Sequence, residues 1–195
     1  NDGDNDVDEN YVKSFFKNTN TNCVYIKNIK NIGAIDSINL GVSKIQSKYF
    51  KISAIDDKFD SSLAFETLSF LCKFPDCGLA ISYPGYYIHN TAKKINISYN
   101  FNKDNFIYYD KSVSKKIFLS NFFKPHSQTI FFNTQIFKSS NIFKSDFGYM
   151  ADLLNNYFIM LNHGFCIIPY NLAYYGLHSE QWSNNINRFD KNFHL

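Results

Sequence analysis

Hydrophobic positions along the first half of the chain switch between two periods. At Ile35, Ile38, Val42 and Ile45 they recur every three or four residues, the spacing that places side chains on one face of a helix. Elsewhere they alternate with polar residues or form the short apolar runs typical of strands. In chain order, the pattern predicts a strand at 22–29, a helix at 33–47, a strand at 48–55, a helix at 60–74 and a strand at 78–89, the last interrupted by a Pro-Gly turn.

A polar interval separates this half from a second one. Residues 90–112 are polar, aromatic and weakly periodic, and we interpret 90–126 as a variable loop region. A strand at 127–133, a helix at 147–164 and a strand at 165–176 are predicted next, with Gly164 at the C-cap of the helix. This alternation predicts a single α/β domain over 1–195, with a mostly parallel sheet flanked by helices.

Composition narrows the class of protein. Hydrophobic residues make up 45% of the 195 residues, which indicates a folded, globular chain. The net charge is +3 and the basic residues are scattered, so we expect no nucleic-acid partner. No run of about 18 apolar residues is present, so no membrane span is predicted. The chain opens on NDGDNDVDEN without a Met, as if cut from a longer chain, which leaves an upstream targeting segment open.

The cysteines show no metal-binding or redox spacing. Cys23, Cys72, Cys77 and Cys166 include no Cys-x-x-Cys pair. Cys23 and Cys166 lie in apolar, strand-like runs, so we predict that both are buried, reduced thiols. A bridge between Cys72 and Cys77 is the less favoured alternative.

Two adjacent aspartates, Asp56 and Asp57, follow the strand predicted at 48–55. Burying neighbouring carboxylates is costly unless a cation lies beside them. Ligands of α/β proteins bind at the carboxyl ends of parallel strands, and Mg²⁺ or Mn²⁺ binds carboxylates together with substrate phosphates. The pair is therefore a candidate site for a metal-bound phosphate ligand. The alternative is a solvated loop in which the second aspartate caps the next helix.

Four segments, taken in order, resemble the family 2 glycosyltransferases, the large inverting group with the GT-A fold. NDGDND at 1–6 is similar to the family's Asp-Gly-Ser-x-Asp turn, although Asp4 stands at the Ser position. Residues 31–57, which end in AIDD, resemble the branch with a Gly-Ile-Tyr-Asp-Ala-Met-Asn segment before its Asp-Asp pair. PHSQTIFFNTQIF at 125–137 resembles the His-Gln strand and the following helix, and 147–183 resembles the acidic acceptor-side helix with its closing His/Ser segment.

On the donor side, the resemblance implies a nucleotide-sugar-binding half at 1–89. Asp2 would contact the base or ribose of the donor, and Asp56 would lie near the ribose and diphosphate. Asp36 and Asn39 would border the donor pocket. Without the resemblance, the acidic N-terminus reads as a flexible, solvated segment.

On the catalytic side, the resemblance implies an acceptor-side half at 127–195. Asp57 would ligate a divalent cation, Mn²⁺ or Mg²⁺, with help from His178. Asp152 would be the general base that takes the proton of the acceptor hydroxyl. Read from the chain alone, Asp152 is an ordinary first-turn acid favoured by the helix dipole, and His178 is a surface histidine.

The activity that this resemblance implies is transfer of a sugar, with inversion, from a nucleotide-diphosphate donor to an acceptor hydroxyl. The acceptor would be a glycan, a lipid-linked molecule or a protein, and the pathway would build a surface polysaccharide or glycan. The expected compartment is the cytoplasm, with peripheral contact at the inner face of the membrane left open. The family's first strand, helix and strand have no counterpart here, so we expect a chain truncated at its N-terminus. A non-catalytic sugar- or nucleotide-binding module, or an inactive glycosyltransferase fragment, is the alternative.

Overall fold

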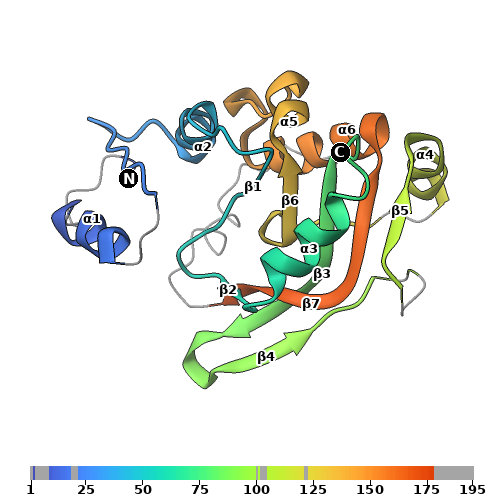
Figure 1. Ribbon diagram of the computed structural model, residues 1–195, viewed down its shortest axis with the longest axis horizontal. Helices are drawn as coiled ribbons and strands as arrows, with labels where there is room; N and C mark the ends of the chain where they lie inside the picture. Colours follow the sequence, from blue (N-terminus) through green and yellow to red (C-terminus); the bar gives the residue numbers. More distant parts are fainter. Residues whose placement is uncertain are drawn as a thin grey trace, which may run out of the picture.

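The computed structural model describes residue 2 and residues 9–18, 22–99, 101, 105–120 and 123–177. These residues form one α/β domain in which helices flank a mixed, seven-stranded sheet (Figure 1). The predicted single α/β domain is therefore confirmed.

The regular elements alternate along the chain. The strands are β1 (Tyr49–Lys51), β2 (Lys58–Phe59), β3 (Leu79–Ile88), β4 (Lys93–Asn96), β5 (Ile107–Tyr109), β6 (Ile130–Asn133) and β7 (Phe165–Leu177). The α-helices are α1 (Glu9–Asn18), α2 (Ala34–Ser43), α3 (Leu63–Leu71), α4 (Lys111–Ser120), α5 (Thr134–Ser140) and α6 (Ala151–His163). The described residues also form the short 3-10 helices η1 (His89–Thr91), η2 (Ser127–Thr129) and η3 (Ser145–Met150).

The sheet has the strand order β1-β6-β3-β7-β2, with β4 added beside β3 and β5 beside β7. The long strands β3 and β7 run parallel, from the pair Leu79–Phe165 to the pair Ile88–Leu177. In the described part of the chain, the other pairings are antiparallel. The expectation of a mostly parallel sheet is therefore wrong. Alternating strands and helices predict the order of the elements along the chain but not the directions of the strands. In the sheet, β6 lies between β1 and β3 and runs antiparallel to both.

Strand direction nevertheless brings three carboxyl ends together. Because β6 is antiparallel to both β1 and β3, these two strands point the same way, and β7 points with them. The carboxyl ends of β1, β3 and β7 therefore point toward one edge of the sheet, where ligands of α/β proteins bind.

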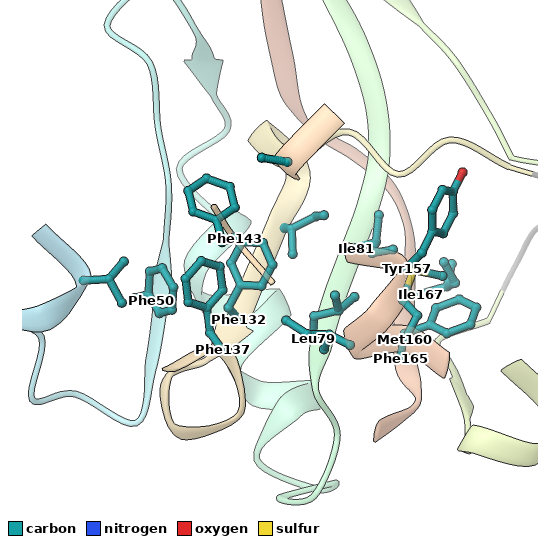
Figure 2. Packing of buried hydrophobic residues seen from close by; sticks show 14 of the residues in the cluster. Phe50, Leu79, Ile81, Phe132, Phe137, Phe143, Tyr157, Met160, Phe165 and Ile167 are labelled. Atoms are coloured by element: carbon teal, nitrogen blue, oxygen red, sulfur yellow. The ribbon is translucent and has the colours of Figure 1, made fainter. Parts of the chain in front are cut away.

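Alternating side chains of β3 divide the core between the two faces of the sheet. Leu79 and Ile81 join a cluster with α5 and α6, in which Phe132 and Phe137 pack 5.1 Å apart (Figure 2). Ala80 joins a second cluster, which includes Leu71 of α3. Because both faces of β3 are covered, its first half reads as a continuous apolar run.

Several local predictions need correction. Residues 22–29 form no strand, and the interval 90–112 contains β4 and β5 as well as loop. The strand predicted at 78–89 is not broken by a turn. It runs through Pro84 as part of β3, and a register shift on each side of Tyr83 absorbs the proline.

The four cysteines are free thiols. The prediction that Cys23 and Cys166 are both buried holds for Cys166 only. Cys166 is buried as expected, 3.5 Å from the sulfur of Cys77, whereas Cys23 is exposed because its segment lies outside the sheet. Cys72 is exposed and unbridged. Among the described residues, no helix has the length and apolarity needed to cross a membrane.

Gly164 ends α6 as predicted, in a conformation that side chains rarely adopt. It has φ 73° and ψ 177°, and a β-carbon there would lie 2.4 Å from the carbonyl oxygen of Tyr109. We expect Gly164→Ala to lower the free energy of unfolding by about 1–3 kcal/mol through backbone strain, with a further loss from the clash. Urea denaturation measures this change.

Gly41→Ala is the matched control, because Gly41 lies inside α2 and its added β-carbon would meet no heavy atom within 4 Å. We expect this variant to be more stable by about 0.5–1 kcal/mol, the helix preference of Ala over Gly. Equal unfolding midpoints for the two variants would contradict the assignment of strain to Gly164.

Candidate functional site

A cavity of about 660 Å³ opens at the edge of the sheet where β1, β3 and β7 end. Its wall combines the segment after β1, the far halves of β3 and β7, the residues before and within η2, and the start of α6. The lining residues are Ile52, Ala54, Asp57, Tyr86, Lys124, Pro125, His126, Ser127, Gln128, Tyr149, Met150, Asp152, Leu153, Tyr175 and Leu177. This cavity, called the edge cavity below, holds the predicted metal ligand and the predicted base.

Asp57 is the buried member of the aspartate pair, with 8% of its surface exposed. One carboxylate oxygen accepts a hydrogen bond from the backbone N–H of Ala54, and the other accepts one from the backbone N–H of Gly176. Both donor–acceptor distances are 3.4 Å. Burial raises the pKa of Asp57, and these backbone donors oppose the rise. Hydrogen bonds this long are weak, so the carboxylate keeps accepting capacity for a ligand in the edge cavity.

Lys51 supplies a cation close to Asp57. Its ammonium group donates to the carbonyl oxygens of Ile52, at 3.0 Å, and of Gln128. Burial lowers the pKa of Lys51 to about 8, while the charge of Asp57 acts in the opposite direction. The lysine therefore offsets part of the cost of burying Asp57 and ties β1 to η2.

Asp56, unlike Asp57, is not among the residues that line the edge cavity. Its carbonyl oxygen lies 3.0 Å from Nε2 of His89, and a β-carbon on Gly176 would approach that oxygen to 2.2 Å. The glycine therefore lets the aspartate turn pack directly against β7, which holds Asp57 in place. The role of Asp56 in donor binding stays a prediction.

Asp152 lies in the first turn of α6 and lines the same cavity as Asp57, although 95 positions separate the two in the chain (152 − 57). Its carboxylate accepts the hydroxyl of Ser127 at 3.0 Å. The Ser127 oxygen accepts in turn from Nδ2 of Asn156, at 3.2 Å. This short network fixes Asp152 on the wall of the edge cavity while leaving it exposed.

His126 and Gln128 belong to the cavity wall and carried no role in the sequence prediction. Burial lowers the pKa of His126, and Lys124 acts in the same direction while Asp152 opposes it. The ring of Tyr86 lies edge-on to His126, with 6.4 Å between the ring centroids. The resemblance of 125–137 to the family's His-Gln strand points to this part of the cavity wall. No motif in the sequence points to Lys51 or Ser127.

The remaining donor-side predictions lie outside the edge cavity. Asp2 accepts the backbone N–H of Ile32, at 2.8 Å, and of Gly33, at 2.9 Å. The first of these hydrogen bonds is the main cause of a lowered pKa for Asp2. Asp2 thus stabilises the loop that leads into α2, and its contact with a nucleotide stays a prediction.

Asp36 and Asn39 lie on α2, beside two other hollows. Both line one of about 560 Å³, where Asn39 donates to the carbonyl oxygen of Phe143 at 2.8 Å. Asp36 also lines a largely apolar groove of about 470 Å³, whose wall includes Tyr149 and Asp152 of the edge cavity. The structure therefore places Asp36, unlike Asp2, in a hollow that adjoins the predicted base.

A divalent cation fits Asp57 only if a ligand completes its coordination. Over the described ranges, no group of three or more His, Cys, Asp or Glu side chains could hold a metal ion. His178 lies outside the described residues. Mg²⁺ in phosphate sites is commonly held by one or two carboxylates together with substrate oxygens. The weakly hydrogen-bonded carboxylate of Asp57 suits that arrangement.

In comparisons with protein families and with curated proteins, no match to this chain is found.

Removal of the Ser127 hydroxyl tests the network behind Asp152. Asn156 is only 1% exposed, so Ser127→Ala would leave its buried amide without this acceptor. We expect a loss of about 1–3 kcal/mol in the free energy of unfolding, the cost of an unsatisfied buried polar group. Chemical denaturation of the purified chain measures it.

Ser139→Ala is the matched control, since the hydroxyl of Ser139 is exposed and donates to the carbonyl of Ile136 within α5. We expect this change to alter stability by less than about 0.5 kcal/mol. If Ser127→Ala were as mild as the control, the network would not hold Asp152.

Proposed function

We propose that this chain is the catalytic domain of an inverting, metal-dependent glycosyltransferase that uses a nucleotide-diphosphate sugar. The observation that carries the proposal is that Asp57 and Asp152 both line the edge cavity. The resemblance implies complementary roles for these two residues, and those roles require them to share one cleft.

The finer fold assignment, GT-A, belongs to this proposal. The ordered resemblance of four segments supports it. So does the position of the aspartate turn, at the edge where the like-directed strands β1, β3 and β7 end.

Charge on the leaving group is the first chemical demand of this reaction. The departing nucleoside diphosphate gains negative charge as its bond to the anomeric carbon breaks. Bound Mn²⁺ or Mg²⁺ would supply a positive charge at that position. Asp57 would hold the ion, and the buried position of Asp57 limits competition from water.

Proton removal from the acceptor is the second demand. An acceptor hydroxyl is a weak nucleophile, so a carboxylate within hydrogen-bonding reach must take its proton as the new bond forms. Asp152 is exposed to the edge cavity and oriented by Ser127, as this role requires. Attack on the face opposite the leaving group would invert the anomeric carbon in one displacement.

The partners in this proposal are a sugar nucleotide and a glycan, lipid-linked or protein acceptor, in the biosynthesis of a surface polysaccharide or glycan. Nucleic acid is not among them. Transfer from the sugar nucleotide would take place in the cytoplasm. A lipid-linked acceptor would bring the domain to the inner face of the membrane.

Loss of the Asp57 charge tests the metal role. We expect Asp57→Asn to abolish the gain in nucleotide affinity that Mn²⁺ produces, because the amide retains the shape but not the charge. Calorimetry with UDP, GDP, dTDP and CDP, each with and without Mn²⁺, measures this. Asp76→Asn, at an exposed site before β3, is the control. Unchanged Mn²⁺ dependence in Asp57→Asn would remove the metal assignment, and no nucleotide binding by the wild type would remove the proposed function.

Loss of the Asp152 carboxylate tests the base. We expect Asp152→Asn to bind the donor as the wild type does but to release the nucleoside diphosphate at least about 100-fold more slowly, the usual contribution of general base catalysis. Calorimetry gives the binding, and a coupled assay gives nucleoside diphosphate release with a panel of simple saccharide acceptors. Near-normal turnover in Asp152→Asn would place the base elsewhere. Binding without turnover in the wild type would favour a non-catalytic module.

A further inference from the structure

The solvent face of α4 is positively charged. Lys111, Lys115 and Lys116 are all exposed on this helix. The sequence contains no Asp or Glu from 111 to 145. Asp110, just before the helix, accepts two backbone N–H groups of the first turn, at 2.7 and 3.0 Å. The outward face of α4 therefore attracts anions.

A large apolar side chain lies among these lysines. Leu119 is 85% exposed. It is three positions from Lys116 and four from Lys115, so the two ammonium groups flank it on the helix surface. The other face of the helix is occupied, because Ile117 and Phe118 pack against the core. Leu119 therefore adds little to the stability of the fold and is available to a partner.

Lysines around a protruding apolar side chain match the surface of an anionic membrane. Ammonium groups are attracted to lipid phosphates, and an apolar side chain can enter between the headgroups. The three lysines are spread over the outward face of a helix about 15 Å long. That spread fits an extended array of headgroups better than one small anion.

The helix lies close to the edge cavity. It packs beside α6 (Figure 1), where the rings of Phe118 and Tyr157 have centroids 5.1 Å apart. Asp152 is five positions before Tyr157 on α6 (157 − 152), about 7.5 Å along the helix axis. The crevice beneath α4 is lined by Phe123, and the next residue, Lys124, lines the edge cavity. A membrane bound at α4 would therefore lie near this cavity.

We propose that α4 binds an anionic membrane surface, with Lys111, Lys115 and Lys116 at the lipid phosphates and Leu119 between the headgroups. The contact itself needs only the charge and exposure of α4. Its consequence for the acceptor rests on the proposed function: the edge cavity would be held beside molecules carried by the membrane, which narrows the acceptor class to lipid-linked ones.

Vesicle co-sedimentation of the full chain tests the contact. The vesicles contain equal parts of phosphatidylglycerol and phosphatidylcholine, or phosphatidylcholine alone. We expect Lys115→Gln/Lys116→Gln to bind the anionic vesicles about 25-fold more weakly than the wild type, about 5-fold for each lysine lost. The control is Lys93→Gln/Lys94→Gln, an exposed lysine pair on β4 that gives the same change in net charge. We expect it to bind within about 2-fold of the wild type, because salt screens charges away from the contact.

Loss of the apolar side chain gives a second, independent readout. We expect Leu119→Ser to bind the anionic vesicles about 5-fold more weakly or less, because it can no longer bury this side chain among the headgroups. Its thermal unfolding midpoint should equal that of the wild type, since Leu119 is exposed. The inference is overturned if the wild type does not bind anionic vesicles, if it binds phosphatidylcholine alone equally well, or if the β4 control loses as much affinity as the α4 pair.

The outcomes also separate this inference from the proposed function. A wild type that binds anionic vesicles through α4 but binds no nucleoside diphosphate with Mn²⁺ keeps the membrane contact and removes the glycosyltransferase. A wild type that binds the nucleotide but not the vesicles removes the membrane contact alone.

Discussion

The parallel pairing of β3 with β7 is the interaction on which the rest of the structure depends. Each of the two strands carries further strands on its other side, β6 and β4 on β3, and β2 and β5 on β7. The first half of β3 is buried on both faces, under α3 on one side and α5 and α6 on the other. The carboxyl ends of this pair form the floor of the edge cavity, and Gly176 of β7 holds the aspartate turn against it.

Incomplete satisfaction of buried polar groups marks this cavity within the fold. Asp57 is buried with two long hydrogen bonds, and Gln128 is buried with a free amide. Such groups reduce stability, so a fold optimised for stability alone would not retain them. Orphan atoms by themselves are a weak signal, because Thr67 and Asn155 also have them away from the edge cavity. Asp57 differs from these residues because it lines a hollow together with a second carboxylate, that of Asp152.

The sequence predicted the periodic parts of the fold well. The helix at 33–47, the helix at 60–74 and the strand at 165–176 correspond to α2, α3 and β7, because each buries one regular face or a continuous run. The strands β4 and β5 were missed, since β4 is exposed along its length and β5 is only half-buried, so neither shows a clear apolar pattern. The direction of β6 could not be predicted, because it depends on pairings between distant segments.

The candidate site was predictable only in part, for a related reason. Asp57 and Asp152 were named because each belongs to a recognisable local motif. Lys51 and Gln128 could not be predicted in this way. They are joined by a hydrogen bond from the Lys51 ammonium group to the Gln128 carbonyl oxygen, and residues 77 positions apart share no local sequence pattern.

The placement of Asp152 links the hollows into one proposed reaction path. It lies on the shared wall of the edge cavity and the largely apolar groove beside α2. Inversion requires the acceptor to approach from the side opposite the leaving group, and a base must be reachable from the acceptor's side. Under the proposed function, a carboxylate on the wall between two hollows meets both requirements. The edge cavity would then hold the donor, and the groove would receive the apolar part of an acceptor whose hydroxyl reaches Asp152.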